Sequence, residues 1–87
     1  MPRFFFQVEG APRDQSGSEL ESIVQAKCEA ARYAGRLLCE EANSFWEQAS
    51  FTMTVMDEND LTLFMLTISG IDAPAIQVLE PPPRRGV

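Results

Sequence analysis

The positions of hydrophobic residues along the chain predict three β-strands. Residues 3–9 and 51–56 alternate between two sets of side chains, as half-buried strands do. Residues 61–68 are apolar on both faces instead, which is typical of a central strand covered on both sides. We therefore expect residues 61–68 to form the middle strand of a small sheet.

Between the first two strands, a helical repeat of apolar residues runs from about Ser22 to Asn43. Ser22 is expected to cap the first turn, and Gln25 stands where a capping box needs it. The apolar face consists of Ile23, Ala26, Ala30, Ala34, Leu37 and Leu38. Small residues in the middle of this face would let the helix lie close to a sheet.

Together these segments predict an α+β fold with the order β-α-β-β. The polar stretch Asp57–Asp60 is expected to be the turn of a hairpin between the last two strands. Insertion of the third strand between the first two gives a three-stranded, mainly antiparallel sheet of order 1-3-2, and the crossover through the helix should be right-handed. One long helix would cover one face.

The domain is expected to span residues 1–70. Residues 71–80 are moderately apolar and form a short C-terminal extension, either a helix capped by Asp72 or an added strand. Residues 81–87 begin with three prolines and are expected to be a disordered tail.

Composition narrows the class of protein further. The chain has 87 residues, 45% of them hydrophobic, which suits one domain with a single core. No apolar run approaches the roughly 18 residues of a membrane span, and the N-terminus does not resemble a signal peptide. The net charge of −6 makes nucleic-acid binding unlikely. These features favour an acidic, cytoplasmic protein.

The sequence indicates no catalytic, metal or cofactor site. Histidine is absent, and Cys28 and Cys39 lie about 16 Å apart on one helix, too far for a disulfide. Asp57–Asp60 resembles the start of a calcium loop, but Leu61 and Thr62 occupy its fifth and sixth positions. We therefore expect a protein that is not an enzyme.

Lys27 interrupts the apolar face of the helix. Its stem could lie on apolar surface while the ammonium reaches water. Alternatively, the ammonium could be buried against a carboxylate such as Asp14, or contact a ligand. The sequence leaves these readings open.

The second face of the sheet is the best candidate for a partner surface. The residues expected there are Phe5, Thr52, Thr54, Met56, Leu63 and Met65. An apolar patch of this kind marks a protein contact unless residues 71–79 fold back over it. The simplest partner is a second copy, which would give a two-fold homodimer.

Several motifs resemble a family of small bacterial domains of unknown function. Its members open with Met-Pro-Arg, two aromatic residues and Phe, as Met1–Phe6 does. Its loop Asp-x-x-Gly-x-Glu-Leu is matched by Asp14, Gly17, Glu19 and Leu20. The family tends to have Pro-Asp at the helix start, where this chain has Glu21-Ser22. The resemblance implies a bacterial cytosolic protein and a usual basic residue at Lys27, but no activity.

A fainter resemblance is to HicB-type antitoxins. They also place strands and an acidic glycine loop before an alanine-rich helix, although with more strands before the helix than this sequence predicts. The resemblance implies an alternative role, namely a regulatory protein that binds an RNase toxin or RNA.

Overall fold

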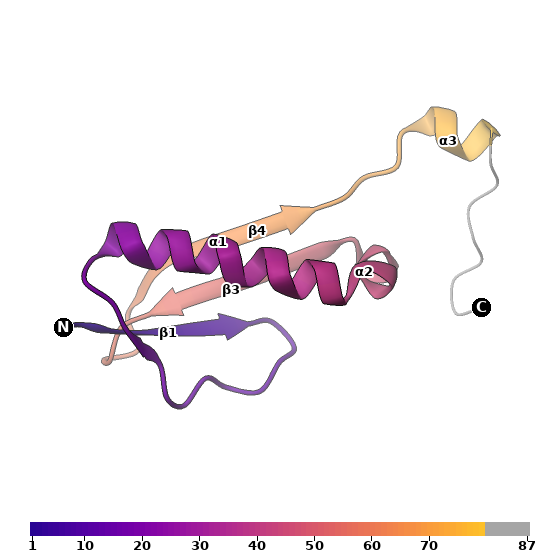
Figure 1. Cartoon of the computed structure of the whole chain (residues 1–87). Helices are drawn as coiled ribbons and strands as arrows, with labels where there is room; N and C mark the ends of the chain where they lie inside the picture. The colour runs from indigo at the N-terminus through magenta and orange to yellow at the C-terminus, as the bar shows by residue number, and fades with distance from the viewer. Residues whose placement is uncertain (80–87) are drawn as a thin grey trace.

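The structure is a computed structural model of the chain that describes residues 1–79. Its elements are β1 (Arg3–Val8), β2 (Ser18–Glu19), α1 (Ile23–Glu40), α2 (Ala42–Gln48), β3 (Ser50–Met56), β4 (Thr62–Ser69) and α3 (Pro74–Leu79). The strands form one sheet, and α1 lies along one face of it (Figure 1). The α+β class is thus as expected, while β2 adds a fourth strand that the sequence pattern did not indicate.

The predicted strand order is wrong. The order is β2-β1-β3-β4, and every neighbouring pair is antiparallel, so the chain makes no parallel crossover. The cause is the loop after β1, which returns along β1: Ser18 pairs with Phe4, and the Leu20 N–H donates to the Pro2 carbonyl at 3.1 Å. Helix α1 therefore starts beside the start of β1 and runs in the same direction, which brings β3 back antiparallel (Figure 1).

Strand β4 lies at the edge of the sheet rather than in its centre. Phe64, Leu66 and Ile68 pack against the core, whereas Met65 is exposed. The register opposes Val55 to Phe64, and then shifts so that Met56 opposes Thr62. The apolar profile on both faces predicts a covered strand, but one whole edge of β4 stays open within residues 1–79.

The predicted helix cap is confirmed. The Ser22 Oγ accepts a hydrogen bond from the Gln25 N–H at 3.2 Å. The Gln25 Oε1 reaches back to the Glu21 N–H at 2.6 Å, one residue earlier than in a standard capping box. The first bond satisfies one of the N–H groups that a helix start leaves without an intrahelical partner, and the second ties the residue before the cap to the first turn.

The single long helix of the prediction is wrong in its second half. Helix α1 ends at Glu40 instead of Asn43, because Glu41 leaves the helical conformation with φ −109° and ψ 25°. The next residues form α2, a separate helix that carries Phe45 and Trp46 in an edge-to-face contact with ring centroids 5.5 Å apart. Ala49 ends α2 in the left-handed conformation.

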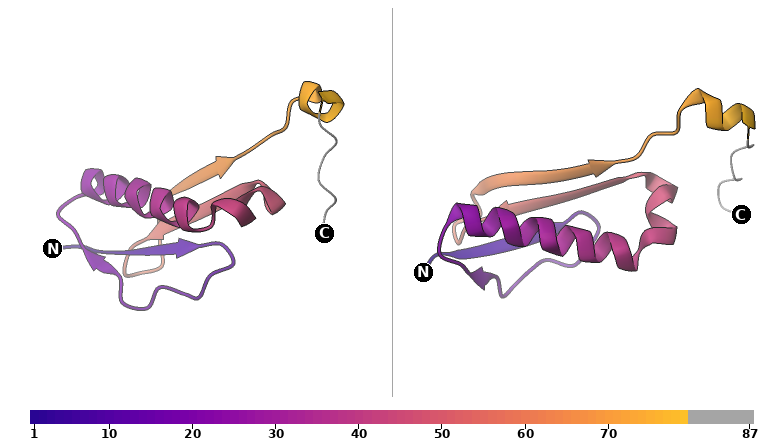
Figure 2. Two further views of the ribbon diagram at one scale, coloured as in Figure 1. Left: turned by 45° about the vertical axis from the view of Figure 1, so that its right-hand side comes forward. Right: turned by 45° about the horizontal axis from the view of Figure 1, so that its top comes forward.

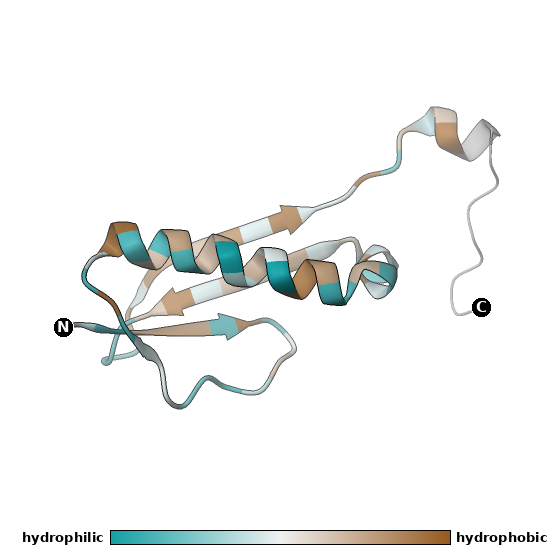
Figure 3. Ribbon diagram, viewed as in Figure 1, coloured by the Kyte–Doolittle hydropathy of each residue, from teal (hydrophilic) through white to brown (hydrophobic). Residues whose placement is uncertain are grey.

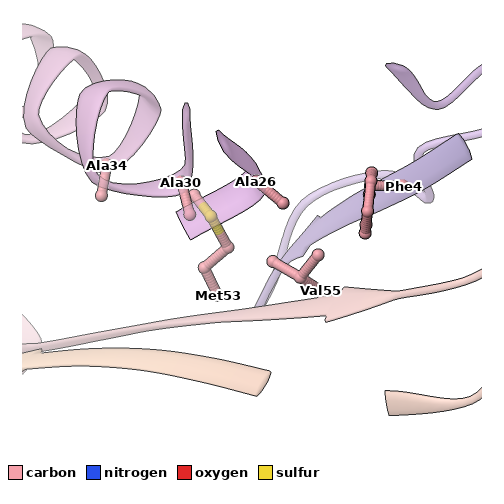
Figure 4. Packing of buried hydrophobic residues seen from close by; sticks show 6 residues of the cluster. All are labelled: Phe4, Ala26, Ala30, Ala34, Met53 and Val55. Atoms are coloured by element: carbon pink, nitrogen blue, oxygen red, sulfur yellow. The ribbon is translucent and has the colours of Figure 1, made fainter. Parts of the chain in front are cut away.

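The core is small and lies between α1 and the sheet. Its buried residues are Phe4, Ala26, Ala30, Ala34, Met53 and Val55. Figure 4 shows the Met53 and Val55 side chains rising from β3 toward the alanines of α1. The small alanine side chains of α1 leave room for the larger Met53 and Val55 of β3. The helix can therefore lie close to the sheet, at a distance set by these side chains.

The hairpin turn is confirmed. One carboxylate oxygen of Asp57 accepts hydrogen bonds from the N–H groups of Asn59 at 2.8 Å and Leu61 at 3.0 Å. Asp60 adopts a positive φ of 63°, which aspartate tolerates. The acidic stretch is accordingly accounted for by the turn that joins β3 to β4.

The segment after β4 stands away from the domain. Residues 70–79, including α3, continue past the end of β4 instead of folding back over the sheet (Figure 2). The radius of gyration is 16.1 Å, against about 12 Å for a compact chain of this length. We call residues 70–79 the C-terminal arm. The expected tail, residues 81–87, lies outside the described residues.

Replacement of a buried alanine tests the close contact between α1 and the sheet. We expect Ala30→Leu to lower the free energy of unfolding by about 1–3 kcal/mol, because three more carbons must enter a filled space. Ala31→Leu is the matched control, since Ala31 is exposed on the same helix and leucine is a good helix former. Urea denaturation measures both; equal stability of the two variants would contradict the packing described here.

Candidate interaction surface

The hydrogen-bond pattern shows which backbone groups of β4 face outward. The Gly70 N–H donates to the Ala49 carbonyl at 2.9 Å, so the opposed residues Ser50 and Ser69 form a non-hydrogen-bonded pair. Hydrogen-bonded and non-hydrogen-bonded pairs alternate along an antiparallel ladder. Ile68, Leu66 and Phe64 therefore bond to β3.

The alternate residues of β4 are Met65, Thr67 and Ser69, and their N–H and C=O groups point away from β3. We call this row of backbone groups the open edge of β4. Within residues 1–79, no hydrogen bond joins this open edge to another segment. A row of backbone donors and acceptors of this kind is a template for a further strand.

The opposite edge of the sheet is closed. The outward groups of β1 belong to Phe4, Phe6 and Val8, because the Glu9 N–H donates to Thr52 and makes Val8 a non-hydrogen-bonded position opposite Met53. Phe4 pairs with β2. The Phe6 N–H donates to the Asp14 carboxylate at 3.0 Å, and the Val8 carbonyl accepts from the Ala11 N–H at 3.0 Å.

Asp14 and Gly17 hold the loop in this position. The second carboxylate oxygen of Asp14 accepts from the Gly17 N–H at 3.0 Å. Gly17 has φ +70°, and a Cβ there would lie 2.9 Å from side-chain carbons of both Arg3 and Phe5. Glycine is therefore required both by its backbone conformation and by the close approach of β1.

Strand β4 lacks most of the features that usually protect an edge. Proteins discourage pairing at edges with charged side chains, prolines or bulges. Residues 62–69 contain no charge and no proline, and the register shift beside Met56 lies at the hairpin end of the strand. The stretch from Phe64 to Ser69 is regular and uncharged.

The structure places five of the six residues of the predicted partner surface on the face of the sheet away from α1. The sixth, Leu63, lies at the register shift and packs against the core. Phe5 and Met56 oppose each other across β1 and β3, and Thr54 opposes Met65 across β3 and β4. Residues 71–79 do not cover this face. The loop after β1 reaches part of it, because the Gln7 side chain bonds to the carbonyls of Ala11 and Pro12.

The exposed part of this face is at β4. Met65 is 59% exposed, whereas Phe5, Thr52, Thr54, Met56 and Leu63 are half-buried. Figure 3 shows that the strands are largely apolar, while the loop and the hairpin turn that flank the sheet are hydrophilic. The candidate surface is thus narrower than the sequence suggests and is centred on β4.

Lys27 does not pair with Asp14. Its side chain is exposed, and its ammonium nitrogen lies 5.9 Å from the centroid of the Phe64 ring on β4. This cation–π contact accounts for a lysine within the apolar face of α1, because the charged end stays exposed to water while it lies over the face of an aromatic ring.

A cleft of about 360 Å³ lies between the loop after β1 and helix α1. Its lining residues are Phe6, Val8, Ala11, Pro12, Asp14, Ser18, Leu20, Glu29, Tyr33 and Arg36. The charged side chains have structural partners: Glu29 pairs with Arg32 at 2.8 Å, and the Arg36 guanidinium lies 5.4 Å from the Tyr33 ring centroid. The charged side chains that line the cleft are therefore engaged in structural contacts and do not converge on one point.

Within residues 1–79, no group of three or more Cys, Asp or Glu side chains is arranged to hold a metal ion. In the same part of the chain, every helix is too short or too polar to cross a bilayer.

Fold and surface together define a small α+β domain whose antiparallel sheet is closed at one edge and open at the other. A family model described as a domain of unknown function (DUF6894) matches residues 3–69, which is most of the chain. The chain belongs to this family. No curated protein and no solved structure matches the chain.

The open edge of β4 was not anticipated from the sequence. Residues 61–68 were expected to be paired on both sides, which would leave no backbone groups of Thr67 exposed. The available signal was the uncharged run between Asp60 and Asp72, which is unusual in a chain of net charge −6.

Removal of the Asp14 carboxylate tests whether it closes the β1 edge. We expect Asp14→Ala to lower the free energy of unfolding by about 1–3 kcal/mol, because the N–H groups of Phe6 and Gly17 lose their acceptor. Asp72→Ala removes the same charge from the exposed arm and should be nearly neutral. Chemical denaturation of both variants decides the question; an Asp14 variant as stable as the Asp72 variant would refute this role.

Proposed function

We propose that the protein is a small non-enzymatic interaction module that acts as a homodimer through the side of its sheet formed by β4. The observation that carries the proposal is an uncharged edge strand with an open row of backbone groups and a Met65 side chain 59% exposed. Apolar side chains beside unpaired strand backbone are costly to leave in water and are a common basis of strand association.

The distribution of chemical groups supports an interaction role over catalysis. Asp14, one of the two acidic residues that line the cleft, uses both carboxylate oxygens to accept backbone N–H groups. The turn residue Asp57 likewise accepts two backbone N–H groups. These carboxylates are engaged in hydrogen bonds that hold loops. The outward backbone groups of β4 make no such hydrogen bonds within residues 1–79.

An antitoxin-like or regulatory role is the second candidate. The observation in its favour is β2. It gives the chain two strands before α1 instead of the one predicted, and HicB-type antitoxins also have more than one strand before their helix. The net charge of −6 favours an RNase toxin over RNA as the partner. A toxin gene beside this one, with a product that co-purifies in a defined ratio, would support this role; failure of the two products to associate would count against it.

Sedimentation equilibrium at micromolar concentration tests the homodimer. We expect the unmodified protein to sediment as a dimer, and Met65→Glu and Leu63→Glu to raise the dissociation constant at least about tenfold, because each buries a carboxylate at the contact. Met65→Glu is the cleaner variant, since Leu63 also packs against the core.

Gln15→Glu is the control for added charge, because Gln15 is exposed in the loop after β1, at the edge of the sheet opposite to β4. It should leave the dimer intact. A protein that sediments as a monomer at every concentration, with or without these substitutions, would contradict the proposal.

A further inference from the structure

We propose that two copies of the chain join by antiparallel pairing of β4 with β4 along the open edge, so that the two sheets become one continuous sheet. The inference rests on the proposed homodimer and specifies its contact. It is distinct from a dimer in which the outer faces of two sheets stack.

Antiparallel pairing of a strand with itself follows from two-fold symmetry. In a two-fold dimer the same residues are used by both copies, and a strand that crosses the axis meets its own copy running in the opposite direction. The outward N–H and C=O groups of Met65, Thr67 and Ser69 then become donors and acceptors for the second copy. Pairing satisfies the backbone groups that are open within residues 1–79.

Charge distinguishes between two registers of this pairing, one centred on Leu66 and one centred on Thr67. If Leu66 lies on the axis, Asp60 of one copy opposes Asp72 of the other, and like charges directly opposite are destabilising. If Thr67 lies on the axis, Asp72 opposes the neutral Thr62, and Met65 opposes Ser69. The second register therefore avoids repulsion in a chain of net charge −6.

The C-terminal arm supports the same arrangement. Ile71 is 88% exposed and Ile76 45% exposed on an arm that continues past the end of β4 (Figure 2). In an antiparallel pair, the arm of one copy extends beside the opposite end of the second copy, where its hairpin turn and the start of its α1 lie. Two further apolar residues are exposed at that end, Leu61 at 61% and Val24 at 71%.

The arm is also needed for sufficient contact area. A stable protein interface buries about 1,200–2,000 Å² in total, more than a single pair of short strands supplies. Contacts of Ile71 and Ile76 with Leu61 and Val24 of the second copy would occur twice by symmetry. One two-fold axis thus covers exposed apolar residues at both ends of the domain.

A proline substitution tests the backbone pairing directly. Thr67→Pro removes one outward N–H and leaves the bonds between β3 and β4 intact, since proline is tolerated on a strand edge. We expect the dimer dissociation constant to rise at least about a hundredfold while circular dichroism shows a folded monomer. Thr67→Val keeps the N–H and should dimerise as the unmodified protein does.

Cysteine cross-linking tests the register independently of any loss of stability. The exposed residues Cys28 and Cys39 are first replaced by serine. In that background Thr67→Cys should form an intermolecular disulfide on mild oxidation, because hydrogen-bonded partners have Cα atoms about 5.5 Å apart. Met65→Cys should not, because four residues of offset separate the two copies of that position by about 13 Å.

The outcomes separate this inference from the proposed function. A monomer at all concentrations overturns both. A dimer that withstands Thr67→Pro and forms no Thr67→Cys cross-link, yet dissociates with Met65→Glu, overturns edge pairing and retains the homodimer. Dissociation by Thr67→Pro but not Thr67→Val, with the Thr67→Cys cross-link, supports both.

Discussion

The carboxylate of Asp14 is the contact on which the arrangement of the chain depends. By accepting the N–H groups of Phe6 and Gly17, it holds the loop after β1 against the outer edge of that strand. The chain therefore returns to the start of β1 before α1 begins, and α1 runs in the same direction as β1. Strand β3 must then come back antiparallel beside β1, which leaves only the far side of β3 for β4. Together with the pairing of β1 and β2, the Asp14 carboxylate thus holds the loop along one edge of the sheet, and β4 forms the other edge.

The contrast between the two edges has a physical consequence. At β1, Phe4 pairs with β2, the Phe6 N–H donates to Asp14, and the Val8 carbonyl accepts from the Ala11 N–H. At β4 the corresponding groups of Met65, Thr67 and Ser69 have no such partner within residues 1–79, and the strand is uncharged. The acidic residues nearest to β4 along the chain, Asp60 and Asp72, lie in the turn before it and in the arm after it. No charged residue therefore lies within β4, the strand that would contact its own copy in the proposed pairing.

Local structure could be read from the sequence, whereas strand order could not. Ser22 and Gln25 identify the helix start because capping chemistry is local, and the alternation of residues 51–56 identifies β3 for the same reason. The order of strands depends on the path of the loop, and that path rests on a bond between Asp14 and Phe6, eight positions apart, which no periodic pattern encodes. Alternation groups Phe5, Thr52, Thr54, Met56 and Met65 on one face of the sheet, but it does not anticipate the register shift that leaves Leu63 against the core. Alternation does not show which strand is at the edge, so Thr67 was missed.

Amide hydrogen exchange at Thr67 is the most direct test of the claim that β4 is an open edge used for self-association. The Phe6 N–H serves as an internal reference, since Asp14 protects it within each chain. Edge pairing predicts that protection of the Thr67 N–H rises at least about tenfold as protein concentration passes through the dissociation constant, while protection of Phe6 stays constant. Exchange at Thr67 that is independent of concentration, in a protein that forms dimers, would contradict the account.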